Sequence, residues 1–319
     1  MDTTDDSMLD TLMQSVVAIK VQAVKNARTT KNFGETRTGT GVVIDTAGLI
    51  ATTGDIVAEA ATISVTFSDG EVSDASLVAY DHHTGLGLLR AMTATPTVAI
   101  TLGDSADVKV DDIAMMIPAS GEADAVALRV GKIAAYSGGW EYIINKALHT
   151  YPPSTSFSGA PLLSENAELL GIGTIISIDI DIDPKIRVPG NVFIPVNTLT
   201  SALGNLLVNG RSDIPSKPWI GLDVRKSKRG LAISAVTETG PADLAGIRSG
   251  DILVAVARQK VDSQNDFFKK VWKSFSPGDE FEIMVLRGAE YHTFPVTASD
   301  YYEWLQKPVS QTQLTELVD

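Results

Sequence analysis

The fold class is decided by the stretch Thr62-Ile63-Ser64-Val65-Thr66-Phe67-Ser68-Asp69-Gly70. Its first six residues alternate between polar and apolar, and this period of two is typical of a strand with one buried face. The last three residues favour a turn, and another short alternating run follows them. We therefore expect a β-hairpin here, with one face of each strand in the core.

Short β-rich runs continue on both sides of this hairpin and are separated by Gly, Asp and Ser. They cover residues 41–44, 86–90, 113–117, 133–136, 169–176 and 192–194. Because few helical patterns lie between them, they favour an antiparallel barrel or sandwich over a sheet of alternating strands and helices. The chain is therefore expected to be mainly β.

Helical patterns stand at the two ends of this β-rich region. Residues 6–23 place Leu9, Leu12, Met13, Val16 and Val17 at helical spacing behind Asp and Ser residues that can cap a helix. We expect a helix there and assign 1–24 as an N-terminal helical segment. The second pattern begins at residue 197, and the glycine at 210 is well placed to end it.

The domain boundary is expected just after the second helix. Residues 211–218 contain two prolines, two serines and three charged side chains without apolar periodicity, which is typical of an exposed linker. The first domain then covers 25–210 and the second covers 219–305. A polar tail, 306–319, completes the chain.

Composition limits the function. The chain has 319 residues, room for about two domains of ~150 residues, and 44% of its residues are hydrophobic, which excludes a disordered chain. The net charge of −13 makes nucleic acid an unexpected partner. There is no Cys, which excludes disulfides and thiol nucleophiles. We expect no transmembrane span, because no stretch approaches ~20 uninterrupted apolar residues, and we expect no cofactor.

Three segments of the first domain resemble the three segments that carry the residues of a Ser-His-Asp catalytic triad. The segments 39–45 and 48–52 look like the opening strand pair of the HtrA-type serine proteases, which share the chymotrypsin-like double β-barrel. In that family the histidine base follows, and Asp55 stands at its position here. The segment 81–89 is similar to the strand that presents the triad aspartate, where Gly85 stands instead. The segment 156–162 resembles the nucleophile loop, and Ser158 is retained.

The second domain resembles the PDZ domain that follows the protease in this family. The resemblance is carried by 219–222, 240–247, 250–253 and 276–279. It implies an α+β domain that binds protein or peptide C-termini by strand addition. Ile220, Gly221 and Leu222 would form the carboxylate loop, and Leu222 to Val224 would offer the strand edge. In the helix after residue 262 we expect Phe267 and Val271 along the peptide groove, with Phe268, Trp272 and Phe275 in the core.

The altered triad predicts a chain that is not an enzyme. A serine hydroxyl is a poor nucleophile without a positioned base, and the ordinary pKa of Asp lies about 2.6 units below that of His, worth ~3.5 kcal/mol of driving force. Ser156 and Phe157 also replace the small residues that shape the family's oxyanion hole. The leading hypothesis is therefore an inactive, HtrA-like pseudoprotease that acts as a peptide-binding scaffold or chaperone-like adaptor.

Two alternatives stay open. In the first, the chain is a divergent, active serine endopeptidase that uses Ser158 with a base from a non-standard position, for which His82 and His83 are candidates. In the second, the chain is a regulatory subunit of an active paralogue. The resemblance also implies a homotrimer formed through the N-terminal region, or a hetero-oligomer. The family is mostly found in cell envelopes such as the periplasm, but this N-terminus shows no export signal, so the compartment stays open and includes the cytoplasm.

A metal site is the remaining chemical alternative. Asp179, Asp181 and Asp183 alternate with isoleucines and place three carboxylates on one face of an extended segment, where oxygen ligands could hold Ca²⁺. The spacing does not resemble a calcium-binding loop. We expect a solvated strand face there rather than a metal site, and surface loop positions for His82 and His83.

Overall fold

The computed structural model describes residues 9–93, 97–119, 125–138, 141–183 and 186–306. The chain divides into two compact units, and the polar tail 307–319 lies outside the described residues. Of the described residues, those from 9 to 136, those from 144 to 213 and residue 306 form the first unit, and those from 137 to 143 and from 214 to 305 form the second. The mainly β class is confirmed, with a double-barrel first domain and an α+β second domain.

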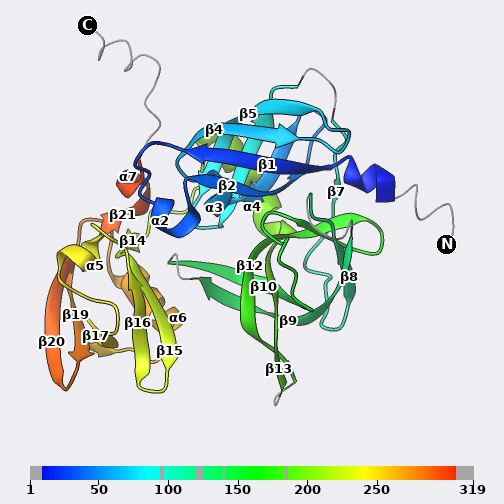
Figure 1. Cartoon of the computed structure of the whole chain (residues 1–319). Helices are drawn as coiled ribbons and strands as arrows, with labels where there is room; N and C mark the ends of the chain where they lie inside the picture. Colours follow the sequence, from blue (N-terminus) through cyan, green and yellow to red (C-terminus); the bar gives the residue numbers. More distant parts are fainter. Residues whose placement is uncertain (1–8, 94–96, 120–124, 139–140, 184–185, 307–319) are drawn as a thin grey trace, which may run out of the picture. The chain divides into compact units, whose positions relative to one another are not determined.

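Six strands of the first unit form a closed antiparallel barrel (Figure 1) in the order β1-β2-β3-β6-β5-β4. Their bounds are β1 Val16–Ala23, β2 Thr36–Val43, β3 Leu49–Thr53, β4 Ala60–Thr66, β5 Val72–Asp81 and β6 Leu86–Ala91. The hairpin predicted from residues 62–70 is β4 and β5, which pair from Ser64 with Asp74 to Thr66 with Val72. Alternate side chains such as Ile63 and Val65 enter the barrel core.

The N-terminal helix was predicted wrongly over most of its length. Residues 9–13 are helical, but Val16–Ala23 is the strand β1, which pairs with both β2 and β4 and closes the barrel. Val17, Ile19 and Val21 are buried, whereas Lys20 and Gln22 are exposed. This period of two, together with β-branched side chains, favours a strand once neighbouring strands are present to pair with it. Residues 1–8 lie outside the described residues.

The second set of strands in this unit forms another ring. The strand order is β11-β8-β9-β10-β13-β12-β7, and the pairing of β11 with β12 closes the circuit. The bounds are β7 Thr101–Leu102, β8 Ile113–Met116, β9 Val126–Gly138, β10 Tyr142–Tyr151, β11 Pro161–Leu163, β12 Glu168–Asp183 and β13 Ile186–Pro195. The core between them includes Met116, Leu148 and Phe193.

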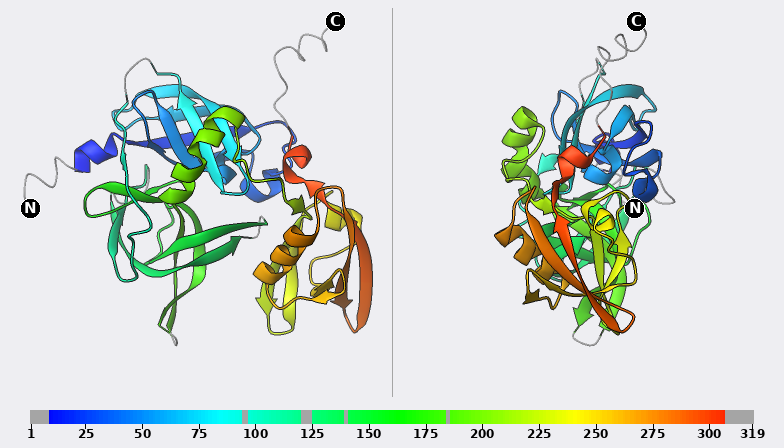
Figure 2. Two further views of the ribbon diagram at one scale, coloured as in Figure 1. Left: turned by 180° about the vertical axis from the view of Figure 1, so that it is seen from behind. Right: turned by 90° about the vertical axis from the view of Figure 1, so that its left-hand side faces the viewer.

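Helix α4, Val196–Asn209, follows the second ring and packs on β5 of the first barrel and on β12 and β13 (Figure 2). The amide of Gly210 donates to the carbonyl of Leu206 at 3.1 Å and adopts a φ of 70°, which is the left-handed conformation of a helix C-terminal glycine. The predicted end of this helix is therefore confirmed. Two short helices, α2 Thr30–Phe33 and α3 Gly54–Val57, lie on connections of the first barrel.

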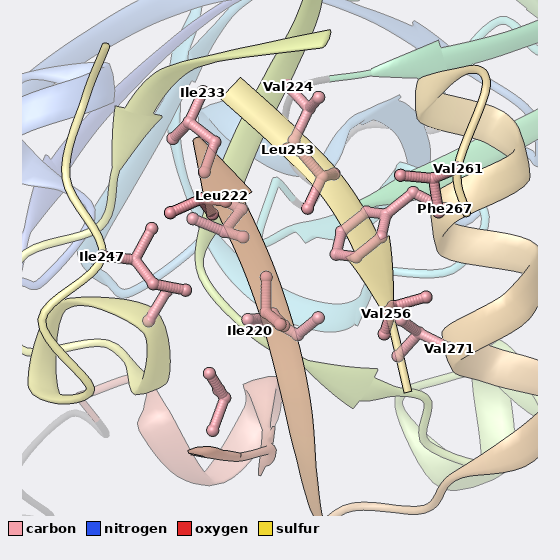
Figure 3. Close-up of a cluster of buried hydrophobic side chains, with 14 of the residues drawn as sticks. Ile220, Leu222, Val224, Ile233, Ile247, Leu253, Val256, Val261, Phe267 and Val271 are labelled. Carbon is pink, nitrogen blue, oxygen red and sulfur yellow. The ribbon is translucent and has the colours of Figure 1, made fainter. Parts of the chain in front are cut away.

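The second unit is a sheet of order β15-β16-β17-β19-β20 with one long helix, α6. Its elements are β14 Pro218–Trp219, β15 Leu222–Ser227, β16 Gly230–Val236, α5 Pro241–Leu244, β17 Ile252–Val256, β18 Gln259–Lys260, α6 Gln264–Ser274, β19 Glu280–Arg287, β20 Glu290–Thr297, β21 Ser299–Asp300 and α7 Tyr301–Trp304. Figure 3 shows the core where side chains of the sheet meet Phe267 and Val271 of α6. β15 is an edge strand of this sheet.

No helix in the described part of the chain has the length and apolar character that crossing a membrane requires.

Candidate functional site

Ser158 lies on the loop between β10 and β11, and the backbone of this loop is fixed against β2. The carbonyl of Ser158 accepts a 2.8 Å hydrogen bond from the amide of Thr40. Gly159 follows with a φ of +74°, and a Cβ there would lie only 1.9 Å from the carbonyl oxygen of Thr40. Only glycine fits at 159, so the turn that presents Ser158 is set by close backbone packing.

The amides around Ser158 are partly used by the protein. The amide of Ser156 donates to Oγ of Ser154 at 3.3 Å, and the amide of Gly159 donates to the carbonyl of Gly173 at 2.8 Å. Phe157, one of the two residues that depart from the family pattern, packs against the core of the second ring. The loop is therefore held by its own side chains and by β12, and a substrate carbonyl would compete with Ser154 for the amide of Ser156.

Asp55 and Gly85, the two positions where the family's histidine and aspartate are absent, are in contact through their turns. Asp55 is the second residue of α3, and the amide of Gly54, the first, donates to the carbonyl of Gly85 at 2.8 Å. Gly85 has a φ of +74° and ends the turn between β5 and β6. The structure therefore brings together the two turns that the sequence segments 39–52 and 81–89 predict as neighbours.

The loop of Ser158 and the turn of Asp55 approach the same point of β2. A Cβ built on Gly39 would lie 3.1 Å from the carbonyl oxygen of Ser158 and 2.2 Å from Cδ1 of Ile56, the residue after Asp55. Gly39 is thus the contact that both segments share, and a larger residue there would push them apart. All three predicted triad positions therefore gather around β2 and β3.

The carboxyl group of Asp55 is in an unusual environment for an aspartate. Burial raises its pKa above the ordinary value, against the charge of Arg37, which lowers it. Arg37 is itself buried and donates to the carbonyl of Asp55 at 3.1 Å and to the hydroxyl of Thr29 at 2.7 Å. A carboxylate whose pKa is raised is a stronger base than an ordinary aspartate.

His82 and His83 are buried, which contradicts the expected surface loop positions. Their exposed fractions are 7% and 6%. The loop is drawn inward by Asp81, whose carboxylate accepts hydrogen bonds from Thr84 and from the amide and hydroxyl of Ser212 at 2.9–3.1 Å. Both histidines lie in the turn between β5 and β6.

Tyr80 lies between His82 and the turn that carries Asp55, and it is close to both. Nδ1 of His82 is 3.4 Å from the Tyr80 hydroxyl, and a Cβ on Gly54 would lie 2.8 Å from the Tyr80 ring. An imidazole is therefore present in the neighbourhood of the triad positions, although it comes from a different residue than the family pattern places there.

Asp181 of β12 is paired with two basic side chains. Asp181 is bonded to Lys132 at 2.7 Å and to Arg187 at 2.8 Å, and the hydrogen bond and charge of Lys132, followed by Arg187, lower its pKa. Within the described residues, no group of three His, Asp or Glu side chains could hold a metal ion. The side chain of Asp179 lies outside what the structure describes.

The second unit contains a carboxylate-binding loop at the predicted place. The amides of Ile220 and Leu222 donate to the carboxylate of Glu141 at 3.0 and 2.8 Å, and the amide of Gly221 between them also donates to it. Gly221 adopts a φ of +84°, which turns these three consecutive amides toward one point. The loop therefore has the geometry that recognises a carboxylate, and the carboxylate present is a side chain of the same unit.

Sequence reasoning missed Glu141. The residue follows the glycine pair at 138 and 139 and lies far from 220–222 along the chain. Its backbone is left-handed, with a φ of 59°, and its side chain is 3% exposed. The only signal in the sequence is an acidic residue in a glycine-rich turn, and such a residue is ordinarily solvated.

The expected division of α6 into core and groove side chains differs from the structure. Phe267 and Val271, expected along the groove, are fully buried together with Phe268, whereas Trp272 and Phe275 are only partly buried against this core. All five apolar side chains therefore contribute to the same core, three within it and two packed against it. The predicted strand edge, Leu222 to Val224, is the start of β15.

Two family models match the chain. A model of the trypsin-like peptidase domain matches residues 39–172, and a model of the PDZ domain matches residues 218–297. The chain therefore combines a trypsin-like peptidase domain with one PDZ domain, and this confirms the predicted HtrA-type architecture.

Similar curated proteins are named serine endoproteases. The chain is 28% identical over 289 residues to a probable periplasmic serine endoprotease, DegP-like, from Halomonas elongata. The alignment covers 82% of this chain and 56% of that protein. The chain is 25% identical over 292 residues to the serine endoprotease DegS of Salmonella typhimurium, covering 86% and 80%. The chain thus spans about half the length of the DegP-like relative.

The fold is also similar to that of a solved structure, the HtrA-type protease AlgW with tripeptide. The identity is 19% and the TM-score is 0.53, with 95% of this chain and 98% of that chain covered. The relatives are named serine endoproteases, and this finding contradicts our expectation that the chain is not an enzyme. The inactive, scaffold-like interpretation gave the missing imidazole more weight than the likeness to these proteases supports.

Proposed function

We propose that the chain is a divergent serine endopeptidase in which Ser158 is the nucleophile and the base is not the family's histidine. The observation that carries this proposal is the gathering of the Ser158 loop and the Asp55 turn at Gly39. In this geometry the hydroxyl of Ser158 attacks the scissile carbonyl, and a neighbouring group accepts its proton. The likeness to named serine endoproteases supports the same reaction.

Asp55 is the base that the site favours. It stands at the family's base position, and burial raises its pKa, which narrows the deficit of ~3.5 kcal/mol between an ordinary aspartate and a histidine. His82, held near Tyr80, is the second candidate. A general base contributes roughly 10²–10⁴-fold to such reactions, so we expect slow turnover rather than none.

The PDZ domain supplies substrate or regulator binding in this proposal. Among the described strands, β15 lies at the edge of its sheet, where a peptide strand could be added, and the amides of 220–222 converge on one carboxylate. A peptide with a free C-terminus would place its carboxylate on this loop and its backbone along β15. Ile220, Gly221, Leu222 and Val224 are the residues we propose for this contact. Assembly as a trimer or with an active paralogue stays a prediction.

Covalent labelling by a fluorophosphonate probe tests the proposed nucleophile. We expect the full chain to be labelled slowly at Ser158, and peptide mass analysis would locate the adduct. Ser158→Ala should abolish the labelling, whereas Ser156→Ala, which removes a neighbouring hydroxyl from the same loop, should keep it. Labelling that persists in Ser158→Ala, or an unlabelled wild type, would contradict the proposal.

The same reaction separates the two candidate bases. If Asp55 accepts the proton, Asp55→Asn should slow labelling by at least about tenfold, whereas His82→Gln should change it little. The reverse ranking would assign the base to His82. Circular dichroism of both variants checks that the fold is retained.

A further inference from the structure

We propose that the carboxylate of Glu141 is a built-in ligand of the loop 220–222, which the C-terminal carboxylate of a peptide must displace in order to bind. The proposal rests on the peptide binding proposed above. It adds that the site is occupied by the protein itself, so that wild-type affinity reports the outcome of a competition.

The contact has the geometry of ligand recognition rather than of a chance surface pair. Oε1 of Glu141 accepts from three consecutive amides, those of Ile220, Gly221 and Leu222, and Oε2 accepts a second bond of 3.0 Å from Ile220. A peptide's terminal carboxylate offers the same two oxygens to these amides. Because three N–H groups cannot satisfy two carboxylates at once, Glu141 and a peptide terminus exclude each other.

The surroundings make this contact displaceable. Glu141 is almost fully buried, and burial raises its pKa to about 7 although the bonds from Leu222, Ile220 and Gly221 lower it. The hydrogen bonds therefore do not fully offset the cost of removing the charge from water. The residue also has a left-handed backbone, which is uncommon for a residue other than Gly, Asn or Asp. Both features favour release of the Glu141 carboxylate from the loop 220–222 when the carboxylate of a peptide binds there.

The placement of Glu141 in the chain is consistent with an internal ligand. It lies on the connection between β9 and β10, and the short segment 137–143 that contains it packs with the second unit. The peptide edge of β15 begins at Leu222, whose amide donates to Glu141, so carboxylate capture and strand addition start at the same residue.

Displacement can be measured without knowing the natural peptide. The full chain, labelled with ¹⁵N-glycine, would be titrated with sodium acetate as a minimal carboxylate, with sodium chloride at equal ionic strength as the control. We expect the amide signal of Gly221 to move with acetate in Glu141→Ala and to stay in place in the wild type. Glu165→Gln, an exposed glutamate of another turn, is the matched control and should behave as the wild type.

A second arm measures peptides directly. The probes are fluorescein-labelled hexapeptides that end in Val, Leu, Ile or Phe with a free carboxylate, and their amidated forms. We expect Glu141→Ala to lower the Kd of the free-carboxylate peptide that binds best by at least about tenfold, and to leave the amidated form unchanged.

The outcomes separate the two proposals. If Gly221 responds to acetate only in Glu141→Ala while no hexapeptide binds any variant, the internal ligand stands and the proposed peptide binding fails. If hexapeptides bind the wild type and Glu141→Ala equally, or if the Gly221 amide is the same in both proteins, the internal ligand is overturned. A thermal melt of each variant shows whether Glu141 acts only as a structural tether, in which case stability falls and affinity does not rise.

Discussion

The amide of Gly54 donates a 2.8 Å hydrogen bond to the carbonyl of Gly85. This bond joins the turn that carries Asp55 to the turn where the family's aspartate is missing. The framework that aligns a triad is therefore kept although two of the three side chains have changed. The backbone therefore orders the turn that carries Asp55 although Gly85 supplies no carboxylate beside it.

Gly159 is the position where substitution should damage the site most through the backbone. Gly159→Ala would place a methyl group 1.9 Å from the carbonyl oxygen of Thr40 at a φ of +74°. We expect a loss of about 2–4 kcal/mol in the free energy of unfolding, measured by urea denaturation. The control is Gly204→Ala in α4, where a Cβ meets nothing within 4 Å, and which should stabilise by about 0.5–1 kcal/mol. Similar effects of the two changes would contradict this packing.

The charge of Asp55 should cost stability at neutral pH. Its folded-state pKa is raised, so the folded protein binds more protons than the unfolded chain, and stability falls as pH rises from the ordinary value toward the raised one. Asp55→Asn removes this cost. We therefore expect the variant to raise Tm at pH 8 and to change it little at pH 4. A variant that is less stable at pH 8 would show that the carboxylate is well paired in the folded state.

Peptide binding should weaken as the solution becomes acidic. Glu141 has a pKa of about 7 in the loop against an ordinary value of 4.5. The occupied loop binds the extra proton, so between about 7 and 4.5 the internal contact is strengthened as pH falls. We expect the Kd of a free-carboxylate peptide to rise by roughly tenfold per pH unit in this window for the wild type.

The same titration with Glu141→Ala supplies the control, because its Kd should vary little over this range. Fluorescence anisotropy at pH 8, 7, 6 and 5.5 measures both proteins. Wild-type affinity that stays constant or improves on acidification would contradict the assigned direction.

Asp251 should hold the second unit together through Arg287. The guanidinium donates two bonds of 2.7 Å to the carboxylate, which is almost fully buried, and these bonds outweigh burial and lower the pKa of Asp251. We expect Asp251→Asn to cost about 2–3 kcal/mol at pH 7, measured by chemical denaturation. The wild-type advantage is present above the ordinary carboxyl pKa and is lost as pH falls through the lowered one. Asp262→Asn, in an exposed pair with Lys260, should change stability by less than about 0.5 kcal/mol.

Sequence patterns predicted the parts of the fold that local periodicity controls. The hairpin of β4 and β5 follows from strict alternation, and the end of α4 follows from a glycine that adopts the left-handed conformation. Residues 16–23 failed because Leu9, Leu12 and Met13 supply a helical spacing that ends at residue 13, after which β-branched residues pair with two neighbouring strands. Local spacing cannot report which strands lie nearby.

Site residues could be predicted where a local motif fixes the backbone. They could not be predicted where contacts with distant segments determine the position of the side chain. Ser158 and Gly221 could be placed from glycine-containing patterns. The burial of His82 depends on Asp81 and Ser212, which lie far apart in the sequence. The role of Glu141 depends on amides of another segment, and no local pattern marks a glutamate that enters a loop so distant along the chain.

The most direct test of the proposed function is the cleavage of an unfolded protein substrate. Purified wild-type chain would be incubated with casein at pH 8, with Ser158→Ala prepared in the same way and fragment ends identified by mass spectrometry. We predict slow cleavage at internal peptide bonds by the wild type and none by Ser158→Ala. Intact casein after prolonged incubation with the wild type, or equal cleavage by both proteins, would contradict a serine endopeptidase that uses Ser158.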